Sequence, residues 1–166
     1  MTATPTPTHE LHALEVGTLY AFREWPNAAV PAVCAGVYSV WRGPALVYVG
    51  MSGRALSTDA IAAQRSAGLR GKGLFSRLNS HASGRRSGDQ FCVYVGDRLV
   101  LPTLTPAELR QIGEGQLSFD RRIRDFIHRE LAYRFVEVPD GAHAGAVERW
   151  ARSGGLRAGK PLLNPL

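Results

Sequence analysis

The chain has 166 residues, a formal net charge of +6, 45% hydrophobic residues and 20% charged residues. This composition indicates one globular domain with a core of its own, and it excludes a wholly disordered chain. No apolar run approaches the roughly 18 residues that cross a bilayer, and the first residues lack the zones of a signal peptide, so we expect a cytoplasmic protein with no membrane partner.

The composition of the N-terminal segment, residues 1–33, predicts an arm that is partly disordered. Its first ten residues are rich in Thr and Pro, and the remainder offers at most an extra strand or a packing arm. Beyond it, two runs rich in Val, Tyr and Trp flank an Arg-Gly-Pro turn at 42–44, a pattern typical of a β-hairpin. Each strand of this hairpin carries one tyrosine, Tyr38 in a Gly-Val-Tyr tripeptide and Tyr48 in a Tyr-Val-Gly tripeptide.

Two helices and a loop are predicted after the hairpin. Residues 55–68 are alanine-rich and indicate a helix, and the Gly-Lys-Gly sequence at 71–73 indicates a basic, flexible loop. Residues 74–84 form a shorter predicted helix that ends at a glycine. At 100° per residue its apolar side chains share one face, and Arg77 and His81 lie along the edge of that face. We expect both to be half buried and to reach into a cleft.

The second half of the chain predicts further strands and helices. In order they are a strand at 91–95, helices beginning at Thr105 and Ser118, a strand at 133–138 and a helix after the Pro-Asp-Gly sequence at 139–141. Thr105 is the expected N-cap of its helix, and Glu108 completes a capping box. On the last helix Glu148 lies at the rim of an apolar face that includes Trp150. The sequence therefore predicts an α/β (α+β) domain over residues 34–166, with no interdomain linker.

Basic residues are concentrated between positions 65 and 98. This segment carries a net charge of +5, from Arg65, Arg70, Lys72, Arg77, Arg85, Arg86 and Arg98 against Asp89 and Asp97. Such a density of positive charge favours a polyanionic partner with a phosphate backbone. The alternative is a solvated basic face with no partner.

The order of these motifs resembles the GIY-YIG nuclease superfamily from Gly36 to Asn164, with one apparent insertion at about 98–131. The resemblance implies the GIY-YIG nuclease fold, a small and mainly antiparallel sheet flanked by helices, and a phosphodiester hydrolase that cuts DNA with one Mg²⁺ or Mn²⁺ ion. By position it assigns catalytic roles to Tyr38, Tyr48, Arg77, His81, Glu148 and Asn164, with Glu148 as the metal ligand. We expect the nucleic-acid contacts to come from Arg54, Arg70, Lys72, Arg77, Arg85 and Arg86.

These residue types suit phosphodiester hydrolysis. A single carboxylate suits Mg²⁺, which keeps several waters and takes phosphate oxygens, and an arginine can hold a phosphate with two parallel donors. The resemblance favours Tyr38 as the general base and Tyr48 as the group that holds the metal-bound water. His81, whose unperturbed pKa is near 6.5, stays open as the base. Taken alone, the last helix favours an ordinary exposed glutamate at Glu148, and Arg77 is equally well a surface arginine; the order of the motifs favours the functional role for Glu148.

Two further points concern the edges of the motif. Met51 stands where many members of the superfamily have a basic residue, and Arg54 or Lys72 could supply that phosphate contact instead. Asn164 is expected to bond the loop beside the metal-binding helix and to hold the tail against the sheet. The function predicted from all these motifs is a restriction or defence endonuclease. The alternatives are a repair or mobile-element nuclease subunit that needs a partner, and a non-catalytic nucleic-acid binding module.

Overall fold

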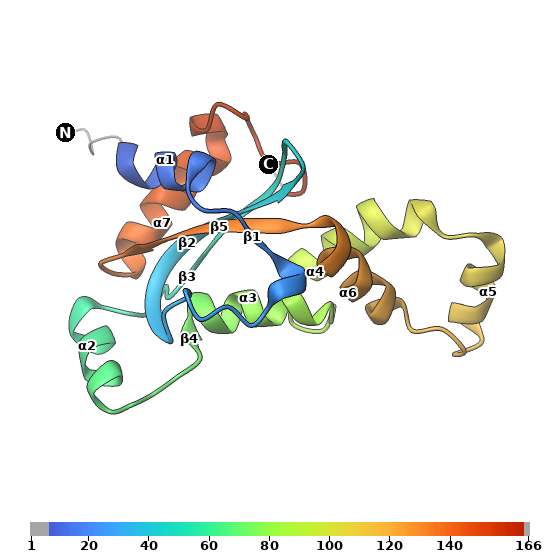
Figure 1. Cartoon of the computed structure of the whole chain (residues 1–166), viewed down its shortest axis with the longest axis horizontal. Coiled ribbons are helices and arrows are strands. Elements are labelled where there is room, and N and C mark those ends of the chain that lie inside the picture. Colours follow the sequence, from blue (N-terminus) through green and yellow to red (C-terminus); the bar gives the residue numbers. More distant parts are fainter. Residues whose placement is uncertain (1–6, 165–166) are drawn as a thin grey trace.

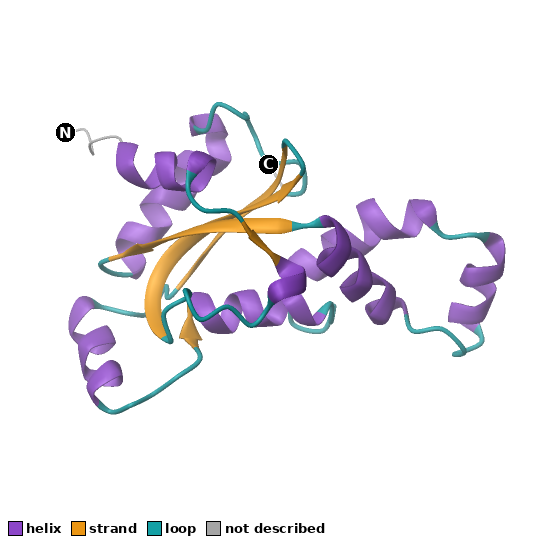
Figure 2. Ribbon diagram, in the orientation of Figure 1, coloured by secondary structure: helices purple, strands orange, loops and turns teal. Residues whose placement is uncertain are grey.

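The computed structural model describes residues 7–164, which form a small sheet with helices on both faces (Figures 1 and 2). The strands are β1 (Tyr20–Ala21), β2 (Val33–Arg42), β3 (Ala45–Ser52), β4 (Lys72–Gly73) and β5 (Ala132–Val138). The α-helices are α1 (Thr8–Val16), α2 (Thr58–Ser66), α3 (Leu74–Ser83), α4 (Gln90–Val95), α5 (Pro106–Gly113), α6 (Phe119–Glu130) and α7 (Gly141–Trp150). Short 3₁₀ or π-type segments are η1 (Phe22–Glu24), η2 (Gly96–Val100), η3 (Leu101–Thr103) and η4 (Ala151–Gly155).

The sheet has the strand order β1-β5-β2-β3 with antiparallel pairing along this path, which confirms the mixed α/β class and the mainly antiparallel sheet. β2 and β3 form the predicted hairpin, in which Tyr38 lies opposite Gly50. In the same register Tyr48 lies opposite Val40, and the register shifts between Val40 and Trp41. Because paired residues share a face and Val40 lies two residues from Tyr38, both tyrosines project from the same face of the sheet.

β2 is the central strand and is buried on both faces, which explains why it reads as a continuous apolar run rather than an alternating one. On one face Tyr38 and Val40 belong to a core formed with α3, α4 and α6. On the other face Val37 and Trp41 belong to a core formed with α1 and α7. The helices of these two layers therefore approach β2 and its neighbours from opposite sides (Figure 2).

The N-terminal segment is more ordered than the sequence predicts. Residues 1–6 of the predicted lead lie outside the described residues, but α1 begins at Thr8 and buries Leu11 and Leu14 against the sheet. The expected extra strand is the short β1, which pairs with β5, and Phe22 beyond it is fully buried. The chain from Thr8 therefore packs on the same body as the hairpin, because its few large apolar residues find places in both cores.

The predicted strand at 91–95 is wrong. Residues 90–95 form α4, whose N-cap is Asp89: one carboxylate oxygen accepts a hydrogen bond from the Cys92 amide nitrogen at 3.3 Å. A five-residue apolar run does not distinguish a buried strand from a buried helix segment by its periodicity. The aspartate before the run is the local signal that favours a helix.

The predicted loop at 71–73 is wrong in part, because Lys72 and Gly73 form β4 and pair in parallel with Val33 and Cys34. Gly73 has a φ of 70°, and a Cβ there would overlap the Cys34 carbonyl group. Glycine is thus required where this backbone touches β2 and turns into α3. α3 itself is confirmed and ends at Gly84, which takes a left-handed conformation with φ 71°.

The predicted insertion, residues 98–131, forms an arm and one core helix. Thr105 caps α5 with the expected capping box, and Ser118 caps α6. α5 lies at the far end of the arm from the sheet (Figure 1), and none of its residues is buried. α6 returns to the body and buries Ile123, Phe126 and Ile127 in the core that contains Tyr38.

The helix predicted after residues 139–141 is confirmed as α7, and most of its predicted apolar face is buried. Ala144, Val147 and Ala151 pack against the sheet, but Trp150 is 40% exposed and is not part of that face. Trp150 lies three residues from Val147 but is directed away from the core by the rotation of the helix. None of the helices formed by residues 7–164 has both the length and the apolar character that a membrane span requires.

Candidate active site

The predicted catalytic residues come from elements on both faces of the sheet, and the charges of Arg77 and Glu148 act on the two tyrosines. Tyr38 and Tyr48 project from the sheet, with ring centroids 6.3 Å apart, and α3 covers them with His81, whose ring lies 6.2 Å from Tyr48. Glu148 is on α7, on the opposite face. Because β3 ends the sheet, the charge of Glu148 can act on Tyr48 past the sheet edge. Burial raises the pKa of Tyr48 to about 12, and the Glu148 charge adds to this effect.

Close packing explains why glycine occurs in each of the two tripeptides, at Gly36 and Gly50. A Cβ on Gly50 would lie on the hydroxyl group of Tyr38, 2.6 Å from its Cζ atom and 3.0 Å from Cε1 of Tyr48. A Cβ on Gly36 would lie 2.6 Å from the Val136 carbonyl oxygen and would overlap Leu74 of α3. Gly50 therefore leaves the space in which Tyr38 lies, and Gly36 lets α3 approach the sheet.

Tyr38, His81 and Asp89 form a buried chain of hydrogen bonds. The Tyr38 hydroxyl group lies 2.7 Å from Nε2 of His81, and Nδ1 of His81 lies 2.6 Å from Oδ2 of Asp89. The three residues are respectively 2%, 1% and 1% exposed. The prediction that His81 is half buried is therefore wrong: the imidazole is enclosed by Tyr38, Asp89 and the Phe91 ring, whose centroid lies 4.4 Å away.

Burial has a large effect on the protonation states of these three hydrogen-bonded side chains. It raises the pKa of Tyr38 well above 10, an effect that the Tyr48 side chain increases and the Arg77 charge opposes. It lowers the pKa of His81 below 6.5, against the effect of Asp89, so the imidazole is neutral at neutral pH. Although burial alone would raise the pKa of Asp89, hydrogen bonds from His81, Ser80 and the Cys92 amide bring it below 3.8.

Arg77 is the exposed cation of the site. Its side chain lies one helical turn before His81, and its charge acts on Tyr38, Tyr48 and His81. The sequence predicts a half-buried arginine, but Arg77 is exposed, because its position on α3 is turned further from the sheet than that of His81. Within residues 7–164 no carboxylate forms an ion pair with Arg77, so its guanidinium can receive an anion.

Glu148 provides the carboxylate. Its side chain is 15% exposed, and burial raises its pKa above 4.5, opposed by the charges of Arg152, Arg54 and Arg149. Nη1 of Arg152 lies 3.8 Å from Oε1 of Glu148. This is an ion pair without a close hydrogen bond, so Arg152 does not saturate the carboxylate as an acceptor.

The divalent metal that the resemblance implies would need oxygen ligands at this site. No three His, Cys, Asp or Glu side chains of the described residues gather as a metal site. A partly exposed carboxylate that is not saturated by hydrogen bonds fits Mg²⁺ or Mn²⁺ with water and phosphate completing the shell, and does not fit a structural zinc site. Glu148 would be the protein ligand of such an ion.

Asn164 closes the free edge of β3. Its Oδ1 accepts a hydrogen bond from the Val49 amide nitrogen at 2.7 Å, and its Nδ2 donates to the Val49 carbonyl oxygen at 2.8 Å. The amide nitrogens of Leu162 and Leu163 also donate to β3. The tail is therefore held against the sheet as predicted, but Asn164 bonds the strand next to Tyr48 and not the loop beside α7.

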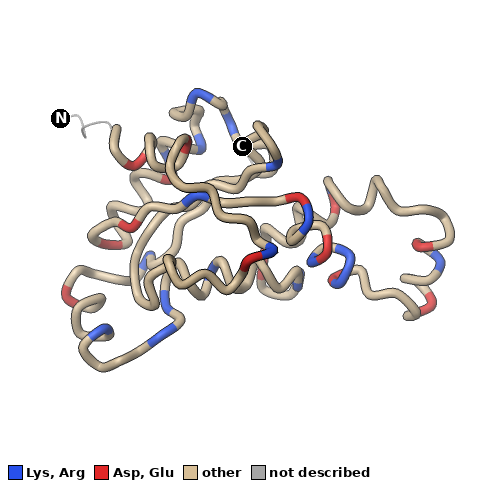
Figure 3. The backbone as a smooth tube through the Cα atoms, viewed as in Figure 1, with Lys and Arg blue, Asp and Glu red and all other residues tan. Residues whose placement is uncertain are grey.

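The predicted nucleic-acid residues are all exposed, but they are spread over several elements (Figure 3). Of the two candidates to replace a basic residue at Met51, Arg54 acts electrostatically on Glu148, whereas Lys72 lies beside Val33 at the start of β2. Arg86 pairs with Asp120 at 2.6 Å and lies over the Phe119 ring. Other residues of the basic segment also have internal partners: Arg65 pairs with Glu137, and Arg98 bonds the Leu162 carbonyl oxygen.

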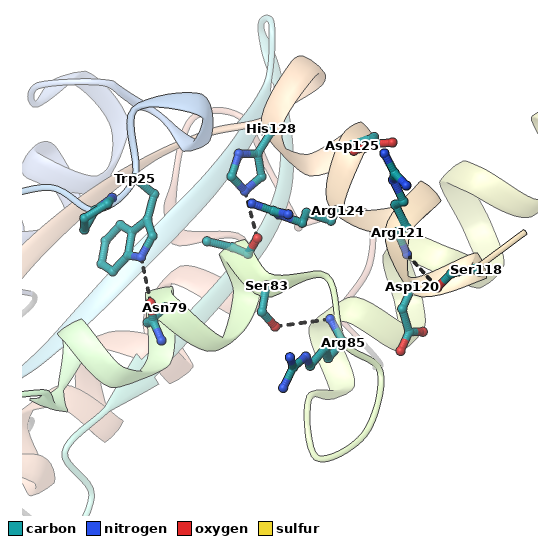
Figure 4. A pocket seen from close by; sticks show the side chains of 12 residues that line it. Trp25, Asn79, Ser83, Arg85, Ser118, Asp120, Arg121, Arg124, Asp125 and His128 are labelled. Atoms are coloured by element: carbon teal, nitrogen blue, oxygen red, sulfur yellow. Dashed lines mark hydrogen bonds between the residues drawn. The ribbon is translucent and has the colours of Figure 1, made fainter.

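A separate hollow of about 920 Å³ lies between α3 and α6. Figure 4 shows Trp25 and Asn79 on one side of it and Arg121 and Arg124 on the other. Arg85, a predicted nucleic-acid residue, also lines this hollow. Asn79 and Arg77 are two residues apart on α3 and so lie on nearly opposite sides of the helix, which separates the hollow from the tyrosines.

Comparisons of the chain with protein-family models, curated proteins and solved structures give no match in any of the three. The sequence resemblance therefore rests on the motif residues and their order. Asp89 is the one residue of the site that the sequence analysis does not select. The sequence does contain a signal for Asp89 as a helix cap, because an aspartate directly before an apolar run is a common N-cap.

Proposed function

We propose that this protein is a metal-dependent DNA endonuclease of the GIY-YIG type, acting in restriction or defence in the cytoplasm. The observation that carries the proposal is the convergence of Tyr38, Tyr48 and His81 under one helix, within the electric fields of Arg77 and Glu148. Two hydroxyl groups, an imidazole, a guanidinium and a carboxylate at one sheet edge supply the groups that phosphodiester hydrolysis needs.

Each residue has a distinct role in this proposal. Arg77 binds a non-bridging oxygen of the scissile phosphate and stabilises the charge that develops there. Glu148 holds Mg²⁺ or Mn²⁺, which supplies Lewis acidity to the phosphate when bound. Tyr48 orients the attacking water, and Asn164 holds the backbone of β3 next to Tyr48 through both hydrogen bonds to Val49.

The proton of the attacking water passes to Tyr38. Because burial raises the pKa of Tyr38, a resting phenolate is not available, and the phenol gives up its own proton as it accepts one. Nε2 of His81 lies 2.7 Å from the phenol oxygen and is neutral, so it is the group that receives that proton. Tyr38 thus contacts the water, and His81 is the final acceptor behind it.

A plasmid-cutting assay tests the proposal. Purified protein is incubated with supercoiled DNA, methylated and unmethylated, in Mg²⁺, Mn²⁺ or EDTA, and the product ends are sequenced. Cutting should require the metal, and Glu148→Gln should abolish cutting while the protein still binds DNA. The matched control is Glu114→Gln, which changes an exposed glutamate at the end of α5. Cutting by Glu148→Gln at the wild-type rate would contradict the assignment of the metal ligand.

A non-catalytic nucleic-acid binding module is the second candidate. It is favoured by the 2% exposure of Tyr38, which leaves little of the phenol accessible to an attacking water. This candidate predicts DNA binding that neither metal converts into cutting. A nuclease subunit that requires a partner is a third candidate, favoured by the projecting arm, whose Leu101 and Leu109 are exposed. It predicts that the purified chain cuts only after a partner protein is added.

A further inference from the structure

Asp89 is a buried carboxylate with no role in the site described by the sequence motifs. It lies between α3 and α4 and makes a different contact with each of its oxygens. Oδ1 accepts the Cys92 amide proton as the cap of α4, and Oδ2 lies 2.6 Å from Nδ1 of His81. A buried carboxylate held by two helices at once has one fixed orientation.

The contact with Asp89 determines which ring nitrogen of His81 carries the proton. An ionised carboxylate only accepts hydrogen bonds, so Nδ1 of His81 must donate to Oδ2. In a neutral imidazole the other nitrogen, Nε2, then has a free lone pair. The Tyr38 hydroxyl group is 2.7 Å from Nε2 and therefore donates to it. The hydrogen bonds run in a single direction, from Tyr38 to His81 to Asp89.

We propose that Asp89 is a positioning residue that holds His81 in the tautomer protonated at Nδ1, so that Nε2 is ready to accept the proton of Tyr38. This inference rests on the endonuclease proposed above and extends it to a residue outside the sequence motifs. Asp89 itself contacts neither substrate nor metal in this scheme.

The proton balance of the step is complete. The water oxygen forms its bond to phosphorus as one water proton moves to the Tyr38 oxygen and the Tyr38 proton moves to Nε2. The phosphorus bond to the leaving oxygen breaks, and that oxygen takes a proton from solvent. The imidazolium that forms next to the Asp89 carboxylate later returns its proton through Tyr38 to solvent.

Asp89→Asn is a sharp test because the cap contact decides how the new amide is oriented. The Cys92 N–H still needs an acceptor, and asparagine is as good an N-cap as aspartate. The amide oxygen therefore stays at the cap, and its NH₂ group faces Nδ1 of His81. Nδ1 becomes an acceptor, and the proton moves to Nε2, which then donates to Tyr38. The variant keeps the fold, but the hydrogen bonds among residues 38, 81 and 89 now run in the opposite direction.

Two measurements on the full chain report this reversal. Nitrogen-15 NMR of labelled protein, with the His81 signals assigned by their loss in His81→Gln, should show protonation at Nδ1 in the wild type and at Nε2 in Asp89→Asn. Cleavage by Asp89→Asn should fall about 10²–10⁴-fold, the range for a lost or wrongly protonated catalytic base, with DNA affinity unchanged. Asp97→Asn, an exposed aspartate in η2, is the matched control and should change neither.

The outcomes separate this inference from the proposed function. An Asp89→Asn protein in which His81 keeps its proton on Nδ1 would overturn the inference. So would a reversed tautomer together with wild-type cleavage. A wild-type chain that cuts no DNA would count against the proposed nuclease alone, and the His81 tautomer in the two proteins would still decide whether Asp89 sets it.

Discussion

Tyr38 and Ser39 are consecutive residues of β2, yet each buries a polar side chain in a different core. Ser39 donates to the Leu14 carbonyl oxygen at 2.6 Å and accepts from Nε1 of Trp41 at 2.8 Å. Tyr38 enters a chain that continues through His81 to Asp89. Both residues are buried, and both have hydrogen-bond partners, so burial and pairing alone do not distinguish a structural polar group from a functional one.

The two networks differ in what their members can do. The groups around Ser39 are a hydroxyl, a backbone carbonyl and an indole N–H, none of which titrates in the physiological range. The Tyr38 network consists of three titratable groups and lies next to the charges of Arg77 and Glu148. A closed neutral network stabilises a fold, whereas a titratable network beside charged side chains can move a proton. The following experiments test this distinction.

Of the variants that compare these two networks, Tyr38→Phe should have the largest effect on activity. It removes the hydroxyl group that accepts the water proton, so cleavage should fall about 10²–10⁴-fold. It also leaves Nε2 of His81 as a buried acceptor without a donor, which should cost about 1–3 kcal/mol of unfolding free energy. Cleavage kinetics and urea unfolding measure the two effects. Tyr94→Phe is the control, and equal cutting by both variants would contradict a role for the Tyr38 hydroxyl.

Ser39→Ala should give the opposite result. It leaves the Leu14 carbonyl and the Trp41 N–H buried without their partner, so the unfolding free energy should fall by about 2–4 kcal/mol. Cleavage at a temperature where the variant stays folded should be unchanged. Urea unfolding and cleavage rates on the same preparation provide the test. A selective loss of cleavage in a stable Ser39→Ala protein would remove the distinction between the two networks.

The stability of the protein should depend on pH through the Tyr38 network. The pKa of His81 is lowered in the folded state, so below about pH 6.5 the unfolded chain binds more protons, and the unfolding free energy falls as the pH falls. The groups that face His81 are Tyr38, Tyr48, Arg77 and Asp89.

Urea unfolding between pH 7 and pH 5 measures this dependence. His81→Gln should flatten it, whereas His12→Gln, a change in an exposed histidine of α1, should not. Asp89 adds a further loss only below about pH 3.8, because its pKa is also lowered in the folded state. The same slope in His81→Gln and in the wild type would show that His81 is not held neutral.

The smallest effect concerns the basic surface outside both networks. Lys72 is exposed and lies beyond the two tyrosines, at the start of β2. If it contacts a phosphate, Lys72→Ala should weaken DNA binding equally for all sequences and reduce the slope of log K against log salt by about 1. Arg110→Ala on the distant α5 is the control. Fluorescence anisotropy across a salt series measures both slopes, and no difference between them would exclude a contact at Lys72.

Much of the secondary structure follows from local sequence. The turn between β2 and β3, the capping box at Thr105, the cap at Ser118 and the glycine that ends α3 were all predicted, because each depends on a few neighbouring residues. The same local order of motifs selected the tyrosines, Arg77, His81 and Glu148. Each of these features is recognised from a few residues that are close together in the sequence.

Only the tertiary structure decided how these pieces meet. The pairing of β4 with β2 and the depth of His81 depend on contacts between segments far apart in the chain. The contact between Asp89 and His81 also depends on the tertiary structure, because the loop between α3 and α4 must fold back to bring the two side chains together. Periodicity shows which residues share a face, but long-range packing determines what that face touches and whether its charges reach solvent.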